Sequence, residues 1–357
     1  MTSYYIKEDN NAPNTKRHPH DPNVLPNETN LFSLPFEVIC VILNVLNEDP
    51  DRLSSAQSCK LLYKAIHKDV GYIKIFVRKQ EDAEKITEHV GILRHTEIII
   101  EKKCNLRLFK GVKDINVKKI SSHVTDDSII SLAGVRSINL NKCKRITNRG
   151  LTALAGVHTI KLRDCKHVGD DGIKALAGVH TIDLRCTYVT DKGIIPLSGV
   201  HQIDLYGCDS ITDKGVKALK GVHTINLGEC SQVTDDGIKA LSGVYSIDLT
   251  SNTNVTDYGI MALSGVHTMT LSGCGRVTDR GIKALKGVHT IFLSDSQVTD
   301  EGLKALAGIH TIYLDGCNRI TDEGVKALKG VHQIALNGCR NITEYGLKAL
   351  VGAYISN

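Results

Sequence analysis

Cysteine and histidine, the side chains that most often bind transition metals, recur in this sequence at fixed intervals. Cysteines stand nine residues after a glycine in successive segments, at Cys143, Cys165, Cys208, Cys230, Cys274, Cys317 and Cys339. Histidines stand two residues after the same series of glycines, at His158, His180, His201, His223, His267, His289, His310 and His332, with Tyr245 in that place once. The chemistry to be tested first is therefore metal binding.

The spacing of the cysteines favours a structural role. A zinc site needs several thiolates that converge, usually from a Cys-x-x-Cys pair. Here each segment contributes one cysteine, and Thr187, Asn252 and Ser296 replace it in three segments. A small polar side chain that hydrogen-bonds to a turning backbone accounts for all four residue types. We expect a ladder of buried cysteines and no metal.

The histidines leave two interpretations open. Equivalent residues of neighbouring strands lie about 4.8 Å apart, so two or three imidazoles could share a soft divalent ion. No carboxylate or second kind of ligand recurs beside them, and the next residue is usually threonine, a hydrogen-bond partner for imidazole. We favour a structural file of histidines, and we expect no cofactor. Protonation of such a file near pH 6 would weaken the array.

The elements that position these residues follow from an internal period. The phrase Gly-Val-His-Thr-Ile-x-Leu recurs every 21 to 23 residues, from Gly111 to Gly352, which gives eleven units. In one unit Ile160 and Leu162 alternate with polar residues, as in a short strand with one buried face. In another, Thr212 and Asp213 are placed to begin a helix, and the glycine of the following unit suits the end of one. A period of this length is typical of leucine-rich repeats. We predict an α/β solenoid with parallel strands on the concave inside and short helices outside.

Composition excludes several functional classes. Tryptophan is absent and aromatic residues make up 4% of the chain, so the core is aliphatic. A formal net charge of +5 without a concentrated basic face argues against nucleic acid as a partner. The sequence has neither a signal peptide nor an apolar run of membrane-spanning length, so we expect no membrane association, a cytoplasmic or nuclear location and unbridged cysteines. No nucleophile elbow, phosphate-binding loop or metalloprotease motif is present, and we expect no enzymatic activity.

Four segments divide the chain. Residues 1–30 are polar and proline-rich and are predicted to be a disordered leader. Residues 31–68 carry two short amphipathic helical patterns, which form too small a core to stand alone. Residues 69–110 contain two degenerate repeats that link this helical segment to the regular array of residues 111–357. The array ends without a polar cap, and we expect its last coil to be a weak edge or a contact for another chain.

The helical segment resembles the F-box. Leu34-Pro35-x-Glu37, the apolar residues that follow and Cys59-Lys60-x-x-Tyr63 match the pattern of that family, with tyrosine where tryptophan is common. The resemblance implies docking to the Skp-type adaptor of cullin ubiquitin ligases through Leu34, Pro35, Ile39, Ile42, Leu43, Leu46, Cys59 and Tyr63. The alternative is a helical cap for the solenoid, which repeat arrays need.

The repeats carry a second resemblance. Over residues 111–352 the units are similar to the cysteine-containing leucine-rich repeats of F-box/leucine-rich-repeat proteins, although they are shorter than usual in that family. The two resemblances in this order imply the substrate-recognition subunit of an SCF-type (cullin–RING) ubiquitin ligase, whose partners are the adaptor and an unidentified substrate protein. The alternatives are an adaptor-independent binding scaffold and a decoy that occupies the adaptor.

The outward residues of the strands are the predicted substrate-binding surface. The repeats are near copies elsewhere, whereas the positions five and seven residues after each glycine vary. We predict a bipartite site, with aromatic and arginine side chains as anchors, formed by Arg163, Asp183, Arg185, Asp204, Tyr206, Asp248, Phe292 and Tyr313. Scattered surface residues are the alternative. A row of lysines on the helices, including Lys217, is interpreted as a solvated face with acidic neighbours.

Overall fold

The protein was analysed as a computed structural model, which describes residues 73–78, 80, 83–84 and 96–356. All eight predicted adaptor-binding residues, from Leu34 to Tyr63, lie outside the described residues. The same holds for the predicted leader and for the whole of the helical segment 31–68.

The described residues form one parallel sheet whose strands follow chain order from β1 to β14. The strands are β1 Ile73–Val77, β2 Thr96–Ile100, β3 Asp114–Asn116, β4 Ser137–Asn139, β5 Thr159–Lys161, β6 Thr181–Asp183, β7 Gln202–Asp204, β8 Thr224–Asn226, β9 Ser246–Asp248, β10 Thr268–Thr270, β11 Thr290–Phe292, β12 Thr311–Tyr313, β13 Gln333–Ala335 and β14 Tyr354–Ser356. Equivalent residues pair directly, as Ile203 does with Ile225, so each position of the repeat becomes a row across the sheet. β1 and β2, which come from the predicted linking repeats, continue this sheet.

Each regular unit adds a short helix after its strand. The α-helices are α4 Asp126–Ile130, α5 Asn148–Thr152, α6 Asp170–Lys174, α7 Asp191–Ile194, α8 Asp213–Ala218, α9 Asp235–Lys239, α10 Asp257–Ile260, α11 Asp279–Ile282, α12 Asp300–Ala305, α13 Asp322–Lys326 and α14 Glu344–Leu347. Short 3₁₀ helices are η4 Leu106–Phe109, η5 Lys118–His123, η6 Ile195–Leu197, η7 Met261–Leu263, η8 Lys283–Leu285 and η9 Lys348–Leu350. No helix in the described part of the chain is both long and apolar enough to cross a membrane.

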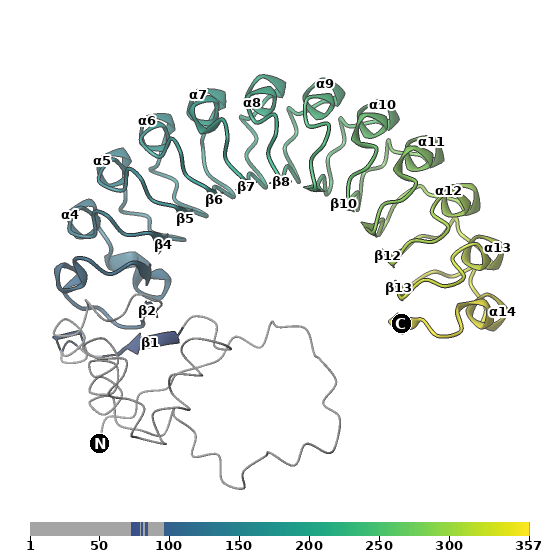
Figure 1. Cartoon of the computed structure of the whole chain (residues 1–357), viewed down its shortest axis with the longest axis horizontal. Coiled ribbons are helices and arrows are strands. Elements are labelled where there is room, and N and C mark those ends of the chain that lie inside the picture. Colours follow the sequence, from purple (N-terminus) through teal and green to yellow (C-terminus); the bar gives the residue numbers. More distant parts are fainter. Residues whose placement is uncertain (1–72, 79, 81–82, 85–95, 357) are drawn as a thin grey trace, which may run out of the picture.

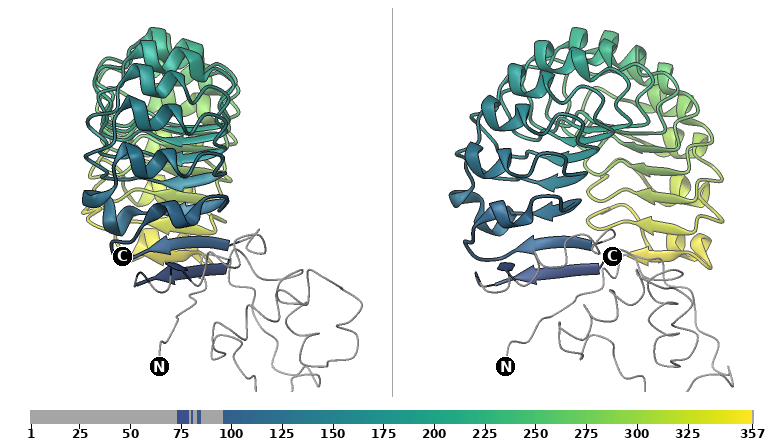
Figure 2. Two further views of the ribbon diagram at one scale, coloured as in Figure 1. Left: turned by 90° about the vertical axis from the view of Figure 1, so that its left-hand side faces the viewer. Right: turned by 60° about the vertical axis from the view of Figure 1, so that its left-hand side comes forward.

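The array is a horseshoe with the strands on its inner side and the helices on its outer side (Figure 1). Viewed from the side, strands and helices form separate layers joined by loops (Figure 2). Neighbouring strands lie closer together than packed helices do. A stack of units with strands on one side and helices on the other therefore bends toward the strands. The predicted solenoid with a concave strand face is confirmed.

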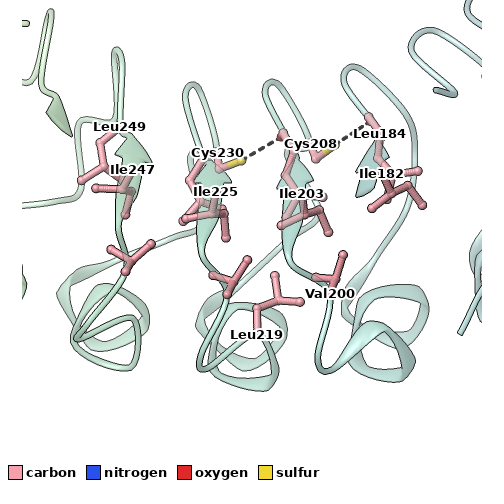
Figure 3. Packing of buried hydrophobic residues seen from close by; sticks show 14 of the residues in the cluster. Ile182, Leu184, Val200, Ile203, Cys208, Leu219, Ile225, Cys230, Ile247 and Leu249 are labelled. Atoms are coloured by element: carbon pink, nitrogen blue, oxygen red, sulfur yellow. Dashed lines mark hydrogen bonds between the residues drawn. The ribbon is translucent and has the colours of Figure 1, made fainter. Parts of the chain in front are cut away.

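Columns of aliphatic side chains fill the space between the two layers. Ile182, Ile203, Ile225 and Ile247 from consecutive strands are all buried and lie above the leucines and valines of the helical side (Figure 3). One unit cannot bury its apolar face alone, whereas each stacked unit covers the next.

The helices begin as predicted, and they also hold neighbouring coils together. The hydroxyl of Thr212 accepts a hydrogen bond from the amide of Lys214 at 3.2 Å, which is the expected N-cap. The following residue, Asp213, lies at the positive end of the helix dipole and also binds the next coil. Its carboxylate accepts from the amide of Thr234 at 2.8 Å and from the Thr234 hydroxyl at 2.6 Å, one coil further on.

This contact recurs through the array as an Asp–Thr ladder. The Oδ1···N distances are 2.7–2.9 Å and the Oδ2···Oγ1 distances 2.6–2.7 Å in the pairs Asp126–Thr147, Asp170–Thr190, Asp191–Thr212, Asp213–Thr234, Asp235–Thr256, Asp257–Thr278, Asp279–Thr299, Asp300–Thr321 and Asp322–Thr343. The ladder also explains the glycine of the Thr-Asp-x-Gly phrase. A Cβ on Gly237 would lie 2.5 Å from Oδ1 of Asp213, so only glycine leaves room for the carboxylate.

Candidate functional site

The cysteines form the predicted ladder, and their partners lie in the preceding coil. The Sγ of Cys208 donates to the carbonyl oxygen of Leu184 at 3.2 Å, and the Sγ of Cys230 donates to that of Leu205 at 3.1 Å (Figure 3). Burial raises the pKa of Cys208 to about 11 and that of Cys230 to about 12. A thiol with such a pKa is neutral at pH 7 and is neither a ready metal ligand nor a nucleophile.

The histidines stack face to face from unit to unit along the array. From His158 to His332, with Tyr245 in the file, successive ring centroids are 4.4–4.7 Å apart and the rings are 11–28° from parallel. Where threonine follows, the ring Nδ1 is bonded to its hydroxyl, as in the 3.1 Å contact between His223 and Thr224. This is the structural contact expected from the sequence. Among the described residues, no group of three or more histidine, cysteine or acidic side chains is arranged to hold a metal ion.

The concave face carries the predicted substrate-binding residues in two separate groups. The first comprises Asp183, Arg185, Asp204, Tyr206 and Asp248, on and just after strands β6, β7 and β9. Arg163, which follows β5, lies at the edge of this group, and its Nε is 3.7 Å from Oδ2 of Asp164. The second group is the pair Phe292 and Tyr313 on β11 and β12. Strand β10 separates the two groups.

Within the first group, Arg185 is held between two carboxylates. Its Nη2 donates to Oδ2 of Asp183 at 2.7 Å and its Nε to Oδ1 of the same residue at 3.0 Å. The Nε also lies 3.2 Å from Oδ2 of Asp204 on the next strand. Asp183 is buried with its charge paired, so its main task is to orient the guanidinium. Burial raises the pKa of Asp204 to about 6, although the amide of Tyr206 and the charge of Arg185 oppose the shift.

Two further contacts orient the other residues of the first group, Tyr206 and Asp248. The hydroxyl of Tyr206 donates to the carboxylate of Glu229, and its ring lies over Gly228, where a Cβ would come within 2.8 Å of a ring carbon. The carboxylate of Asp248 accepts from the hydroxyl of Thr250 at 2.6 Å. The side chains of the first group are therefore held in place by contacts within the chain.

The second group is an aromatic pair. The rings of Phe292 and Tyr313 are 4.3 Å apart and 4° from parallel, and both side chains are half-buried. The Tyr313 hydroxyl accepts a hydrogen bond from Nε2 of Gln333 at 3.0 Å, which anchors the outer ring. The core beneath the pair is already filled by Ile291 and Ile312.

Sequence reasoning missed Glu229 as part of the surface. It stands eight residues after its glycine, where the backbone turns after the strand with a positive φ in each unit from Gly134 to Gly330. Glu229 has φ 56°; four units use glycine there, as at Gly207, and five others also use a non-glycine residue, as at Asp164. Non-glycine residues are common at this position of the repeat, so nothing in the sequence singled out Glu229 as the partner of Tyr206.

The outer helices show the paired lysines that the sequence predicted. Lys174 binds Asp171 at 2.8 Å and Lys304 binds Glu301 at 2.6 Å, each within one helix. Lys239 and Lys326 make the same kind of contact. These four pairs, together with the exposed Lys217, make the convex side a solvated face.

Comparison with known proteins agrees with the fold. The profile of the family described as leucine-rich repeat matches residues 135–155, 157–177, 200–220, 290–307 and 310–329. A search of curated protein sequences finds no match. An internalin of Listeria monocytogenes is similar in structure, with a TM-score of 0.52 and 17% sequence identity over 82% of this chain and 96% of the internalin.

Two other solved structures are similar at lower scores. A leucine-rich-repeat protein of Leptospira interrogans has a TM-score of 0.48 at 13% identity, over 81% of this chain and 90% of its own. A chain from the yeast Rad7–Elc1 complex has a TM-score of 0.46 at 13% identity, over 90% of this chain and 98% of its own. Its single curved parallel sheet, its outer helices and the five matched segments show that this chain has the fold of a leucine-rich-repeat solenoid.

Proposed function

We propose that this chain recognises a substrate protein on the concave face of its repeats and delivers it to a cullin–RING ubiquitin ligase through a Skp-type adaptor. Recognition would occur at Arg163, Asp183, Arg185, Asp204, Tyr206, Asp248, Phe292 and Tyr313. Docking to the adaptor would use residues 31–68.

The observation that carries the recognition half is the contrast between positions within the repeat. Positions that hold coils together, such as the cysteine and the Thr-Asp-x-Gly phrase, change little along the chain. Positions that point outward from the concave strands range from Asp204 to Phe292 in chemical character. Packing does not require this variety, and a curved sheet offers these rows to a partner as one continuous surface.

The adaptor half is supported by the sequence alone. Leu34-Pro35-x-Glu37 and the apolar residues after it follow the F-box pattern, and the segment precedes leucine-rich repeats, as in the family that the chain resembles. The competing proposals are a repeat scaffold that acts without an adaptor, with residues 31–68 as its cap, and a decoy that binds the adaptor without delivering a substrate.

The first experiment is a binding measurement between the purified full chain and a Skp-type adaptor. We expect micromolar or tighter binding that is lost in Leu34→Ala/Pro35→Ala and in Leu43→Asp, while Lys217→Ala on the convex side binds as the wild type does. Absence of binding by the folded full chain would reject the adaptor role and leave the scaffold. If the adaptor binds, reconstitution with the remaining ligase subunits separates a receptor from a decoy, because only a receptor supports ubiquitin transfer to the bound partner.

A further inference from the structure

We propose that the concave face between β6 and β12 selects an extended protein segment in which a lysine or arginine lies about three residues from an aromatic or large aliphatic residue. This inference rests on the proposed recognition role of the concave face, and it specifies the chemistry of the partner.

The apolar half of the surface is the stacked pair of Phe292 and Tyr313. Neither ring fills the core, because Ile291 and Ile312 beneath them are buried. The neighbours in the same row are the small residues Thr270 and Ala335, so the sides of the pair are not covered by larger side chains of the row. Half-buried aromatic rings held in one orientation lose little conformational entropy on binding, and they favour an apolar partner.

The basic requirement comes from the charge of the outward residues. Along β6 to β9 and the turns after them, these residues include four carboxylates and one cation: Asp183, Asp204, Glu229 and Asp248 against Arg185. Arg185 is already paired with Asp183 and Asp204. The same positions along β10 to β12 add Asp295 and Asp315 and no cation. The face therefore carries excess negative charge.

The burial of Asp204 and the positive charge at the β5 end of the row both favour a cation of the partner beyond β5. The raised pKa of Asp204, about 6, reflects burial that the charge of Arg185 only partly offsets. A second cation placed between Asp204 and Asp248 would stabilise both ionised carboxylates. Lys161 on β5 and Arg163 after it make the neighbouring end of the row positive, so a basic segment is confined to the region beyond β5. The phosphates of a nucleic acid would meet the wrong sign of charge from β6 onward.

The spacing follows from the repeat itself. Equivalent rings in consecutive units are 4.3–4.7 Å apart, and we take this as the distance per unit along each row. Asp248 and Phe292 occupy the same row two units apart, so about 9 Å separates them, and an extended chain covers that distance in about three residues at roughly 3.3 Å each. Asp204 lies two units beyond Asp248, so a second basic residue fits about three positions further along.

The experiment is selection of a phage-displayed library of random twelve-residue peptides against the immobilised full chain. We expect enriched peptides to carry lysine or arginine about three positions from an aromatic or aliphatic residue. Their affinity, measured by fluorescence anisotropy with synthetic copies, should fall about tenfold or more in Phe292→Ala/Tyr313→Ala. The affinity should fall by a similar factor in Asp204→Asn/Asp248→Asn. Added salt should weaken binding less in that variant than in the wild type.

The matched control is Lys217→Ala, which changes a charge on the convex side and should leave affinity unchanged. Circular dichroism verifies that each variant is folded. Enriched peptides without the basic residue, or affinities that are insensitive to both double variants, would overturn the inference. If peptides of another composition bind and are lost with the same variants, the proposed segment is wrong while concave-face recognition stands. Adaptor binding is measured separately and does not depend on either outcome.

Discussion

The Asp–Thr ladder predicts that a single carboxylate on the outer side of the array contributes measurably to stability. The perturbation is Asp235→Ala in the middle of the array. The Asp235 carboxylate accepts from the amide of Thr256 at 2.7 Å and from its hydroxyl at 2.6 Å. A hydrogen bond to a charged group contributes about 1.5–3 kcal/mol net, with the lower figure suited to a half-exposed site. Loss of both bonds, together with the charge at the start of α9, should cost about 3–4 kcal/mol.

The assay is urea unfolding of the full chain followed by circular dichroism, with wild type and variants compared by midpoint and slope. Asp235→Asn should cost less than the alanine variant, because its side-chain oxygen can still accept from the Thr256 amide. The chain contains this arrangement already: Asn148 accepts from the amide of Gly169 at 2.8 Å, where no hydroxyl is present. A change below about 0.5 kcal/mol for Asp235→Ala would refute the reasoning, since it would equal the effect of an ordinary surface substitution.

A second arm separates the ladder from a helix-dipole effect. A Cβ on Gly259 would lie 2.6 Å from Oδ1 of Asp235. Gly259→Ala should therefore destabilise the wild type by about 1–3 kcal/mol through overpacking, and it should destabilise much less when Asp235 is alanine. A double-mutant cycle measures this coupling. A dipole effect alone predicts additive changes, because it involves no contact between the two residues.

Three further predictions follow from the other rows. Burial and the neighbouring histidines lower the pKa of His310. Because its folded pKa lies below its unfolded value, the stability it contributes is present above about pH 6.5 and is lost as the pH falls. The melting temperature should therefore drop between pH 7.5 and 5.5, and a flat profile would contradict the effect. Iodoacetamide at pH 7.5 should modify half-exposed Cys186 in the folded chain well before buried Cys230, as measured by peptide mass spectrometry, and equal rates would contradict the cysteine ladder. Asn148→Asp/Gly169→Thr should complete the rung that is interrupted between Asp126 and Thr190, and it should raise stability by about 1 kcal/mol in urea unfolding. A loss of stability would show that the site cannot accept the hydroxyl.

The fold could be predicted from the sequence because the period specifies each unit and its neighbour together. Alternation around Ile160 gives the strand, the capping threonine gives the helix, and a unit of this length cannot bury its face without another. The partner of each cysteine was harder to predict. Its sulfur was expected to bond to a turning backbone, but the carbonyl that it reaches belongs to the preceding coil, as for Cys230 and Leu205.

The candidate site could be predicted only in part. The sequence placed Phe292 and Tyr313 in adjacent strands, and stacking followed because equivalent positions are one strand spacing apart. The pairing of Arg185 with two carboxylates was not predicted, because a long side chain can turn toward either neighbour and the repeat does not fix its rotamer. The same limit applies to the contact between Tyr206 and Glu229.

The division of labour within each unit has a consequence for recognition. The cysteine, the Asp–Thr pair and the glycine beside it are all engaged in contacts between coils, so changes there affect stability first. The residues in the row of Asp204 and Phe292 contact neighbouring coils only at the surface, above buried isoleucines. A substitution there therefore changes the surface that a partner meets while the core beneath stays buried. A scaffold of this kind can therefore acquire a different partner by substitution along one row, and the near identity of the remaining positions keeps the curvature and spacing of that row constant.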